Sequence, residues 1–281
     1  MSSERVAAGN AKTRTERIAR VLLGMFAILV FIFLIAPILA ILPLSFNDST
    51  FLVYPMRGFT LHWYGDVFAS EKWRLAVENS FLIGIPAACI ATVLGTLAAI
   101  GLSLADFRGK AVVTALLLSP LVVPIIIVAV GLYFFFAPLG LTQTYAGLIM
   151  AHAALGAPFV VVTVSSALAS FDRNLARAAA SLGAPPVVVF RRVMLPLVRP
   201  GVISGALFAF AVSFDEVVTI LLLAAPQQRT IPREMFDGMR DSLNPSITAV
   251  AAMLVTLAVV LLLVVEWLRV RNERLRKAKV D

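Results

Sequence analysis

The chain has 281 residues, of which 60% are hydrophobic and only 14% charged, and its mean hydropathy is +0.94. Soluble domains are about 45–50% apolar and about 25% charged, so no single soluble core hides this much apolar surface. The composition excludes an ordinary cytosolic enzyme, a disordered regulator and a fibrous protein, and it indicates a polytopic helical membrane protein. The single cysteine, Cys89, lies in an apolar run, which leaves no disulfide framework and no cysteine-based metal site.

Six apolar segments approach or exceed the roughly 20 residues that a membrane-spanning helix needs. In chain order, we expect helices over residues 21–44, 80–105, 111–136, 144–168, 201–225 and 246–265. The third and fourth lie in one uncharged stretch that turns at Pro138-Leu139-Gly140, and Asp215-Glu216 interrupts the fifth. An even number of spans places both termini on the same side of the membrane.

The basic residues predict which side that is. With a cytoplasmic N-terminus, 18 of the 24 Lys and Arg residues fall on cytoplasmic segments, which is the bias that membrane proteins show. We therefore expect both termini in the cytoplasm. The net charge of +8 is then a topology signal, and no separate basic domain remains to bind nucleic acid. The first apolar run exceeds the about 7–15 residues of a signal-peptide core, so we expect it to be retained as a span.

Three segments between the expected spans are long enough to carry function. Residues 45–79 and 226–241 are expected outside the membrane, and residues 169–200 in the cytoplasm. The first external segment contains Trp63, whose indole suits either the membrane interface or a cation–π contact with an alkylamine.

The cytoplasmic segment predicts two short helices joined by a tight turn. The first begins near Asp172 and ends at Gly183, because Pro185-Pro186 prevents its continuation. The second covers about 187–194 and ends before Pro196. From local physics alone, this helix pair is either a docking site for another protein or a simple amphipathic connector.

The same segment resembles the signature of the membrane subunits of bacterial binding-protein-dependent ABC importers. That signature is Glu-Ala-Ala, three residues, Gly, nine residues and Ile-x-Leu-Pro; here Ala178-Ala179, Gly183 and Val193-Met194-Leu195-Pro196 keep its spacing. Arg177 stands at the usual Glu position, so the charge that the family places at this point of the coupling segment is reversed here. The resemblance implies that a coupling helix binds the ATPase subunit through Arg177, Ala178, Ala179, Gly183, Leu195 and Pro196.

Further stretches resemble the second permease of spermidine/putrescine-type importers. They are Leu44-Ser45-Phe46-Asn47, Gly58-Phe59-Thr60, Trp63-Tyr64, Phe107-Arg108-Gly109-Lys110, Ser119-Pro120, the run 158–164 and Ser213-Phe214-Asp215-Glu216-Val217-Val218. Leu121 departs from the pattern, because permeases of this type tend to carry an acidic residue there. The likeness extends from residue 37 to residue 265.

This resemblance implies an all-α, six-helix type I ABC importer fold in the bacterial inner membrane, with the coupling helix between helices 4 and 5. The implied division is a basic cytoplasmic tail over 1–20, a first transmembrane helix over 21–44, a periplasmic loop over 45–74, an ABC transmembrane type-1 domain over 75–268 and a basic cytoplasmic tail over 269–281.

The sequence contains no nucleotide site of its own. The only Gly-Lys pair is Gly109-Lys110, and it lacks the first glycine and the final Ser or Thr of a P-loop. His62 and His152 are too far apart to suggest a metal site, and we expect His152 to be packed and hydrogen-bonded. We therefore expect no catalytic residue, metal or cofactor. The resemblance implies two copies of a cytoplasmic ATPase, a different second permease as heterodimer partner, and an extracytoplasmic solute-binding protein; lipid surrounds the spans.

Asp215 and Glu216 are the best indication of the cargo. Carboxylates inside a span are costly and usually face a bundle interior or water. Adjacent helical residues point about 100° apart, so the two carboxylates share a direction only if the helix is broken. One interpretation is that they line the translocation path, together with Ser213 and Trp63, and favour a cation such as spermidine or putrescine. The other is a structural pair or a helix break at a gate.

Other functions remain open from the sequence. A permease of the same group with another cargo, such as an opine, a phosphonate, ferric iron or an amino-acid derivative, fits the same motifs, because specificity resides mainly in the external binding protein. A secondary transporter that works without ATP, and an intramembrane enzyme, are the alternatives from different classes. Scattered serines and the lone His152 offer no nucleophile–base pair for the latter.

Overall fold

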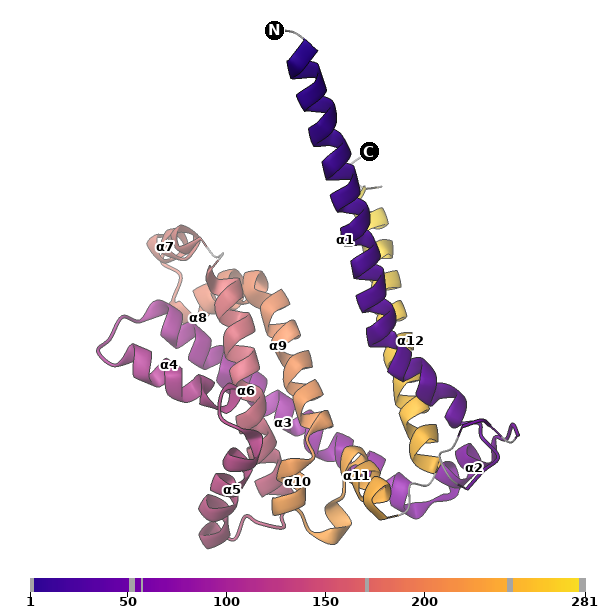
Figure 1. Ribbon diagram of the computed structural model, residues 1–281. Helices are drawn as coiled ribbons and strands as arrows, with labels where there is room; N and C mark the ends of the chain where they lie inside the picture. Colours follow the sequence, from indigo (N-terminus) through magenta and orange to yellow (C-terminus); the bar gives the residue numbers. More distant parts are fainter. Residues whose placement is uncertain (1–2, 51–53, 57, 170–171, 242–244, 278–281) are drawn as a thin grey trace. The chain divides into compact units, whose positions relative to one another are not determined.

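The computed structural model describes residues 3–50, 54–56, 58–169, 172–241 and 245–277, and almost all of these residues are helical (Figure 1). They form two compact units. The first comprises the two ends of the chain, Met1–Ala69 and Asp241–Asp281, and the second is the middle, Ser70–Arg240. No strand occurs among the described residues, so the all-helical prediction is confirmed for this part of the chain.

The first unit consists of three helices: α1 (Ser3–Leu44), α2 (His62–Ala69) and α12 (Ser246–Lys277), which packs against both of the others. The expected first span, 21–44, lies within α1, but the helix begins much earlier than the span. Residues 3–20 are rich in Ala, Arg and Glu and contain no proline, so nothing in them stops a helix. The apolar part of α1, Glu16–Leu44, is not buried at all within the structure.

The segment between α1 and α2 is held by side-chain contacts. The Ser45 hydroxyl lies 2.8 Å from the Tyr64 hydroxyl, and the rings of Phe46 and Phe59 are stacked with centroids 4.9 Å apart. The range 45–79, which we expect outside the membrane, contains α2 and the start of the next helix.

Three helices form the centre of the second unit: α3 (Glu71–Leu104), α6 (Tyr145–Ala169) and α9 (Leu195–Asp215). They approach closely because small residues line their contacts. A Cβ atom added at Gly95 would lie 2.7 Å from Cβ of Val160, and one added at Gly205 would lie 2.5 Å from Oγ1 of Thr163. Such small residues let helix backbones pack tightly in a membrane. The buried core between the helices includes Ala87, Ala91, Ala99, Val160, Val164, Val198 and Ala209.

The third expected span, 111–136, is not one helix. It is α4 (Lys110–Leu118), the short 3₁₀ turn η1 (Ser119–Leu121) and α5 (Ile125–Phe136), with a bend of 106°. Pro120 and Pro124 lack the backbone N–H that a continuous helix needs, and Pro124 has an extended ψ of 130°. The break expected at Pro138-Leu139-Gly140 is confirmed by the turn η2 (Ala137–Leu139) and the left-handed Gly140.

The segment 172–200 begins as predicted but continues differently. Asp172 caps α7 (Arg173–Ser181) by accepting a hydrogen bond from the Asn174 amide at 2.9 Å. Gly183 has a φ of +83°, as its role in the turn requires. The following helix does not end before Pro196. Instead α8 (Pro186–Val189), the π turn η3 (Phe190–Met194) and α9 form one helix, because the wide π turn accommodates the proline.

The fifth expected span is interrupted where predicted. After α9 ends at Asp215, the chain continues through α10 (Val218–Leu223), whose Ile220 and Leu223 are buried with Phe136 of α5 and Leu148 of α6. The segment 226–241, which we expect outside the membrane, is mostly helical. After the turn η4 (Pro226–Gln228), α11 (Ile231–Asp241) is a polar helix with Arg and Asp one turn apart, as in the 2.9 Å pair Arg233–Asp237.

Among the described residues, four single helices are long and apolar enough to cross a membrane, and the bent pair α4–α5 makes a fifth candidate. The four are Glu16–Leu44, Glu71–Leu104, Tyr145–Ala169 and Pro186–Asp215. The sixth expected span lies in α12, whose described apolar part is the shorter segment Ser246–Val260. Each expected span thus overlaps helical segments; the third is the bent pair α4–α5, and the fifth is divided between α9 and α10.

Candidate functional site

In the second unit α9 runs antiparallel to α3 and α6, so the end of α9 lies near the starts of the other two helices. In Figure 1, α7 lies at one end of these helices, and α10 and α11 lie at the other. Phe81, near the start of α3, contacts Phe214, near the end of α9. The expected coupling residues and the expected carboxylates therefore lie at opposite ends of one helical bundle.

The two carboxylates lie at a true break in the helix. Glu216 has an extended conformation, with φ −76° and ψ 120°, and its Oε1 atom accepts a hydrogen bond from the Thr219 amide at 2.7 Å. Glu216 thus caps the first turn of α10. Asp215 is exposed and has no hydrogen-bond or ion-pair partner among the described residues. The two adjacent carboxylates consequently differ, with one held by the backbone and the other free.

Ser213 faces away from Asp215. It is buried, and its Oγ atom lies 2.8 Å from Nδ1 of His152 on α6. Two helical residues turn the chain by about 200°, so Ser213 and Asp215 lie on opposite sides of α9. The prediction that His152 is packed and hydrogen-bonded is confirmed, while its Nε2 atom has no partner among the described groups.

Trp63 belongs to the first unit and has a structural contact there. Its Nε1 atom donates a hydrogen bond to the Asn47 carbonyl at 2.8 Å, and its ring is half-buried. The indole therefore anchors α2 to the segment that follows α1. Ser213, Asp215 and Glu216 all belong to the second unit.

An aromatic cluster lies beside the helix break and was not predicted from the sequence. Phe81 on α3 and the pair Phe210 and Phe214 on α9 have ring centroids 5.4–6.2 Å apart. The spacing of four between Phe210 and Phe214, directly before the two carboxylates, was the available signal, because such residues share a helix face. A groove of about 340 Å³ continues from Phe210 between α3 and α9.

A buried polar cluster holds the chain after α10 to the bundle. The Asn79 side chain donates to the carbonyls of Gln227 and Arg229, both at 2.9 Å, and accepts a 2.8 Å hydrogen bond from the Tyr145 hydroxyl. The neighbouring Ser80 hydroxyl accepts the Ile231 amide at 2.9 Å. These contacts link segments about 150 residues apart, and no local sequence pattern predicts them.

The expected coupling residues lie mainly at the surface of the other end. Arg177, Ala178 and Pro196 are exposed, and Ala179 and Leu195 are half-buried. Next to them, an apolar groove of about 550 Å³ separates the α7 turn from the end of α3. Its lining residues are Ile100, Leu104, Ala180, Ala184, Pro186, Val187, Val189, Phe190 and Met194. The surface at this end thus has small exposed side chains next to an apolar groove.

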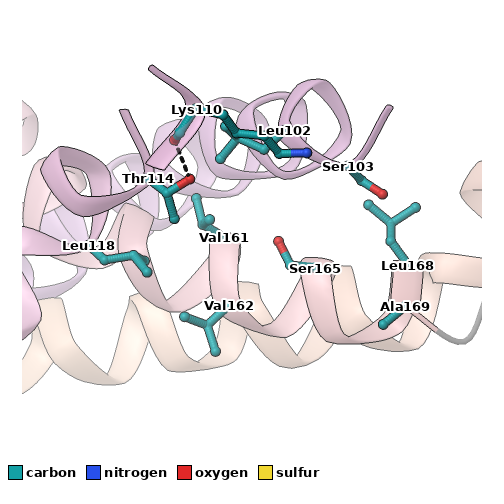
Figure 2. A pocket seen from close by; sticks show the side chains of 10 residues that line it. All are labelled: Leu102, Ser103, Lys110, Thr114, Leu118, Val161, Val162, Ser165, Leu168 and Ala169. Atoms are coloured by element: carbon teal, nitrogen blue, oxygen red, sulfur yellow. Dashed lines mark hydrogen bonds between the residues drawn. The ribbon is translucent and has the colours of Figure 1, made fainter. Parts of the chain in front are cut away.

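A further cavity of about 570 Å³ lies at this same end, among α3, α4 and α6. Figure 2 shows its lining, including the Thr114 hydroxyl that donates to the Lys110 carbonyl at 2.9 Å. The Lys110 ammonium is already bonded to the Ala105 carbonyl and to Asp106. No carboxylate lines this cavity, so it is separate from the acidic site.

Comparison with known proteins gives consistent matches. Residues 91–277 match the family described as the binding-protein-dependent transport system inner membrane component. The chain is 32% identical over 246 residues to the spermidine/putrescine transport system permease protein PotC of Escherichia coli K12, covering 88% of this chain and 93% of PotC. It is 33% identical over 267 residues to the putrescine transport system permease protein PotI of the same strain, covering 92% of each.

The fold is also similar to a solved structure of a bacterial alginate ABC transporter in complex with alginate pentasaccharide-bound periplasmic protein. The TM-score is 0.67 at 19% sequence identity, and the match covers 87% of this chain and 93% of that chain. At this identity, the likeness concerns the fold alone.

Proposed function

This chain belongs to the family of binding-protein-dependent transport system inner membrane components and is a permease subunit of an ABC importer, and from this premise we propose that its cargo is a small oligocation of the polyamine class. The observation that carries the proposal is Asp215. It is an exposed, unpartnered carboxylate among the described residues, at the C-terminal end of the apolar helix α9. A carboxylate at such a position is costly unless it faces water or a cation.

The relatives support the same cargo. PotC and PotI are named for the transport of spermidine and putrescine, and both molecules carry two or more ammonium groups. Negative charge on the path offsets the hydration that these groups lose when they enter a membrane protein. Asp215 supplies that charge, whereas the hydrogen bond of Glu216 to α10 gives it a structural task in addition. Ser213 has an indirect role, because its hydrogen bond to His152 holds α9 against α6.

The chain supplies one half of the path and needs partners for the rest. We assign it a different second permease and an extracytoplasmic binding protein, and ATP hydrolysis belongs to two copies of a cytoplasmic ATPase. The exposed Arg177 and Ala178 of α7, with Ala179, Gly183, Leu195 and Pro196, form the contact with one ATPase subunit. Trp63 in the first unit and α11 in the second unit are each assigned, separately, to contact the binding protein outside the membrane. Both termini are then cytoplasmic, the transmembrane type-1 domain covers 75–268, and 45–74 is periplasmic.

The mechanism follows from the continuity of one helix. The helix from Pro186 to Asp215 extends without interruption from the α7 turn to the acidic break. When ATP closes the ATPase dimer, movement of α7 is transmitted along this continuous helix to Asp215 and the break at Glu216. The outward-facing state accepts the cargo from the binding protein, and hydrolysis restores the inward-facing state. The cargo thus biases the equilibrium through its different affinity for the two states.

The test is ATP-driven uptake of spermidine by the complete transporter in proteoliposomes, with the Asp215→Asn variant. We expect uptake to fall about tenfold, which corresponds to about 1.4 kcal/mol, while the complex still assembles. Asp48→Asn is the matched control, because Asp48 is an exposed carboxylate of the first unit. Undiminished uptake by the Asp215 variant would contradict the role of this charge. Absence of spermidine and putrescine binding by the partner binding protein, measured by calorimetry, would exclude the polyamine cargo.

A further inference from the structure

The cavity of about 570 Å³ lies where three helices of the second unit end or begin. The last turns of α3 and α6 and the first turn of α4 line its rim, through Leu102 and Ser103, Leu168 and Ala169, and Lys110. Both α3 and α6 are long and apolar enough to cross a membrane. Spans of this kind leave the hydrocarbon near their ends, so the rim lies at the level of the lipid headgroups.

The polarity of the cavity lining falls with distance from these helix ends. Lys110, Thr114 and Leu118 of α4 line the cavity at intervals of four residues, so an ammonium group is followed by a hydroxyl and then by an apolar side chain. On α6, Ser165 lies about one turn before the end of the helix, and Val161 lies about one turn farther inward. The charge and the hydroxyls are thus near the rim, and the innermost lining is apolar. An amphiphile with a polar head fits such a cavity.

Lys110 carries the charge of the lining. Its ammonium group has three N–H donors, and two of them are used by the Ala105 carbonyl at 3.0 Å and by Asp106 at 3.2 Å. The Lys110 side chain is 35% exposed and that of Asp106 is 97% exposed, so this ion pair is weak and the carboxylate stands in the solvent. One donor of the ammonium group therefore remains for a further acceptor.

Ser165 offers a second donor from the opposite wall. In Figure 2, the Lys110 side chain extends from α4 toward Leu102 of α3, and the Ser165 hydroxyl points from α6 into the same cavity. Ser165 is half-buried, and its hydroxyl has no hydrogen-bond partner among the described residues. An ammonium N–H and a hydroxyl from two different helices are thus available to one anion.

We propose that this cavity binds an anionic phospholipid, whose phosphate accepts hydrogen bonds from the Lys110 ammonium and the Ser165 hydroxyl. Part of an acyl chain then lies against Leu118 and Val161. Basic pockets between membrane helices are known to bind anionic lipid headgroups. Charge excludes the cargo as the occupant, because an ammonium group repels a polyamine and no carboxylate lines the cavity. A soluble anion would leave the apolar inner lining in contact with water, which a lipid chain covers.

Photolabelling tests the proposal on the complete transporter in phosphatidylcholine proteoliposomes. A phosphatidylglycerol with a diazirine in its acyl chain is added and irradiated, and mass spectrometry maps the labelled peptides of this chain. We expect residues 114–118 and 161–165 to take a large share of the label. The same diazirine on phosphatidylcholine should give these segments a share about tenfold smaller, because a hydrogen bond between charged groups contributes about 1.5 kcal/mol.

Three results of this experiment would overturn the proposal. Equal shares from the two lipids would mean that the cavity does not select an anionic headgroup. Absence of label in both segments would mean that another subunit covers the cavity. Loss of the phosphatidylglycerol label on addition of inorganic phosphate would mean that the site takes a soluble anion. Each result leaves the cargo and the proposed function untouched, because this cavity is separate from Asp215.

Variants separate a specific site from general attraction to a basic surface. Lys110→Met keeps an apolar stem without the charge and should lower the phosphatidylglycerol share about tenfold, whereas Lys110→Arg should restore it. Arg108→Met is the matched control, because Arg108 is an exposed cation of the same turn outside the lining. Asp106→Asn should raise the share, since it removes the carboxylate that competes for the ammonium. Equal loss in Lys110→Met and Arg108→Met would refute the site.

A variant that keeps every charge provides an independent test. Ser165→Leu fills the cavity with an apolar side chain and removes the second donor, while the ion pair of Lys110 with Asp106 is unchanged. We expect the phosphatidylglycerol share in residues 114–118 to fall to the phosphatidylcholine level. Undiminished labelling in Ser165→Leu would contradict binding inside the cavity, whatever the Lys110 variants show.

Discussion

The Oγ atom of Ser213 and the Nδ1 atom of His152 lie 2.8 Å apart and join the last turn of α9 to the first half of α6. Both side chains are buried, and the bond lies three residues before the helix breaks at Glu216. It sets the rotation of α9 about its own axis, and with it the side on which Asp215 is exposed. A short polar contact inside an apolar bundle thus determines the geometry of the acidic site.

Removal of the Ser213 hydroxyl should destabilise the protein. Ser213→Ala leaves Nδ1 of His152 buried without its partner, which costs about 1–3 kcal/mol. Thermal unfolding of the purified complex in detergent measures the change. Ser119→Ala is the control, because Ser119 is only half-buried and its hydroxyl bonds only to the nearby Leu116 carbonyl. Ser213→Ala combined with His152→Phe should lose less than the two single variants added together. Strict additivity would mean that the hydrogen bond contributes nothing.

Glu216 should tolerate loss of its charge better than loss of its oxygen atoms. Glu216→Gln keeps an acceptor for the Thr219 amide, so we expect stability close to that of the unmodified protein. Glu216→Ala removes the cap of α10 and should cost about 0.5–2 kcal/mol. Unfolding measurements on both variants test this order. A Gln variant as unstable as the Ala variant would show that charge, and not capping, is what the fold requires at this position.

Asn79 should hold the segment around Arg229 in place. Asn79→Ala leaves the carbonyls of Gln227 and Arg229 and the Tyr145 hydroxyl without their shared partner, a loss of about 2–4 kcal/mol. We expect faster trypsin cleavage after Arg229 and Arg233. Tyr145→Phe removes only one of the three hydrogen bonds and should have a smaller effect. Equal protease resistance of the Asn79→Ala variant and the unmodified protein would contradict the role of Asn79 in holding this segment.

The turn after α7 should require a residue that accepts positive φ. Gly183 has a φ of +83°, yet a Cβ atom there would meet nothing within 4 Å. Gly183→Leu therefore strains the backbone by about 1–2 kcal/mol without a clash, while Gly183→Asn should be nearly neutral. The Leu variant should retain less ATPase subunit on co-purification and show slower ATP-driven uptake. Normal coupling in the Leu variant would argue against this turn as the ATPase contact.

The breaks along the chain could be predicted from the sequence because their causes are local. Pro138-Leu139-Gly140, Gly183 and Asp215-Glu216 each act through backbone conformation or charge at one place, and the structure confirms all three. The bend of 106° in the third span was missed. The prolines of this span are plain in the sequence, but the uniform apolar run around them also fits a straight helix. Hydropathy does not report the angle between two successive helices.

The sequence by itself determined that this protein is helical and membrane-embedded, where most spans lie, and which loop carries the family signature. These properties follow from composition and short-range spacing. Only the tertiary structure decided that Phe81 meets Phe210 and Phe214, that Asn79 holds the Arg229 carbonyl, and that Ser213 is turned away from Asp215. The physical reason is that these relations join residues distant in the chain. They depend on how closely small residues allow α3, α6 and α9 to pack and how each helix is then rotated.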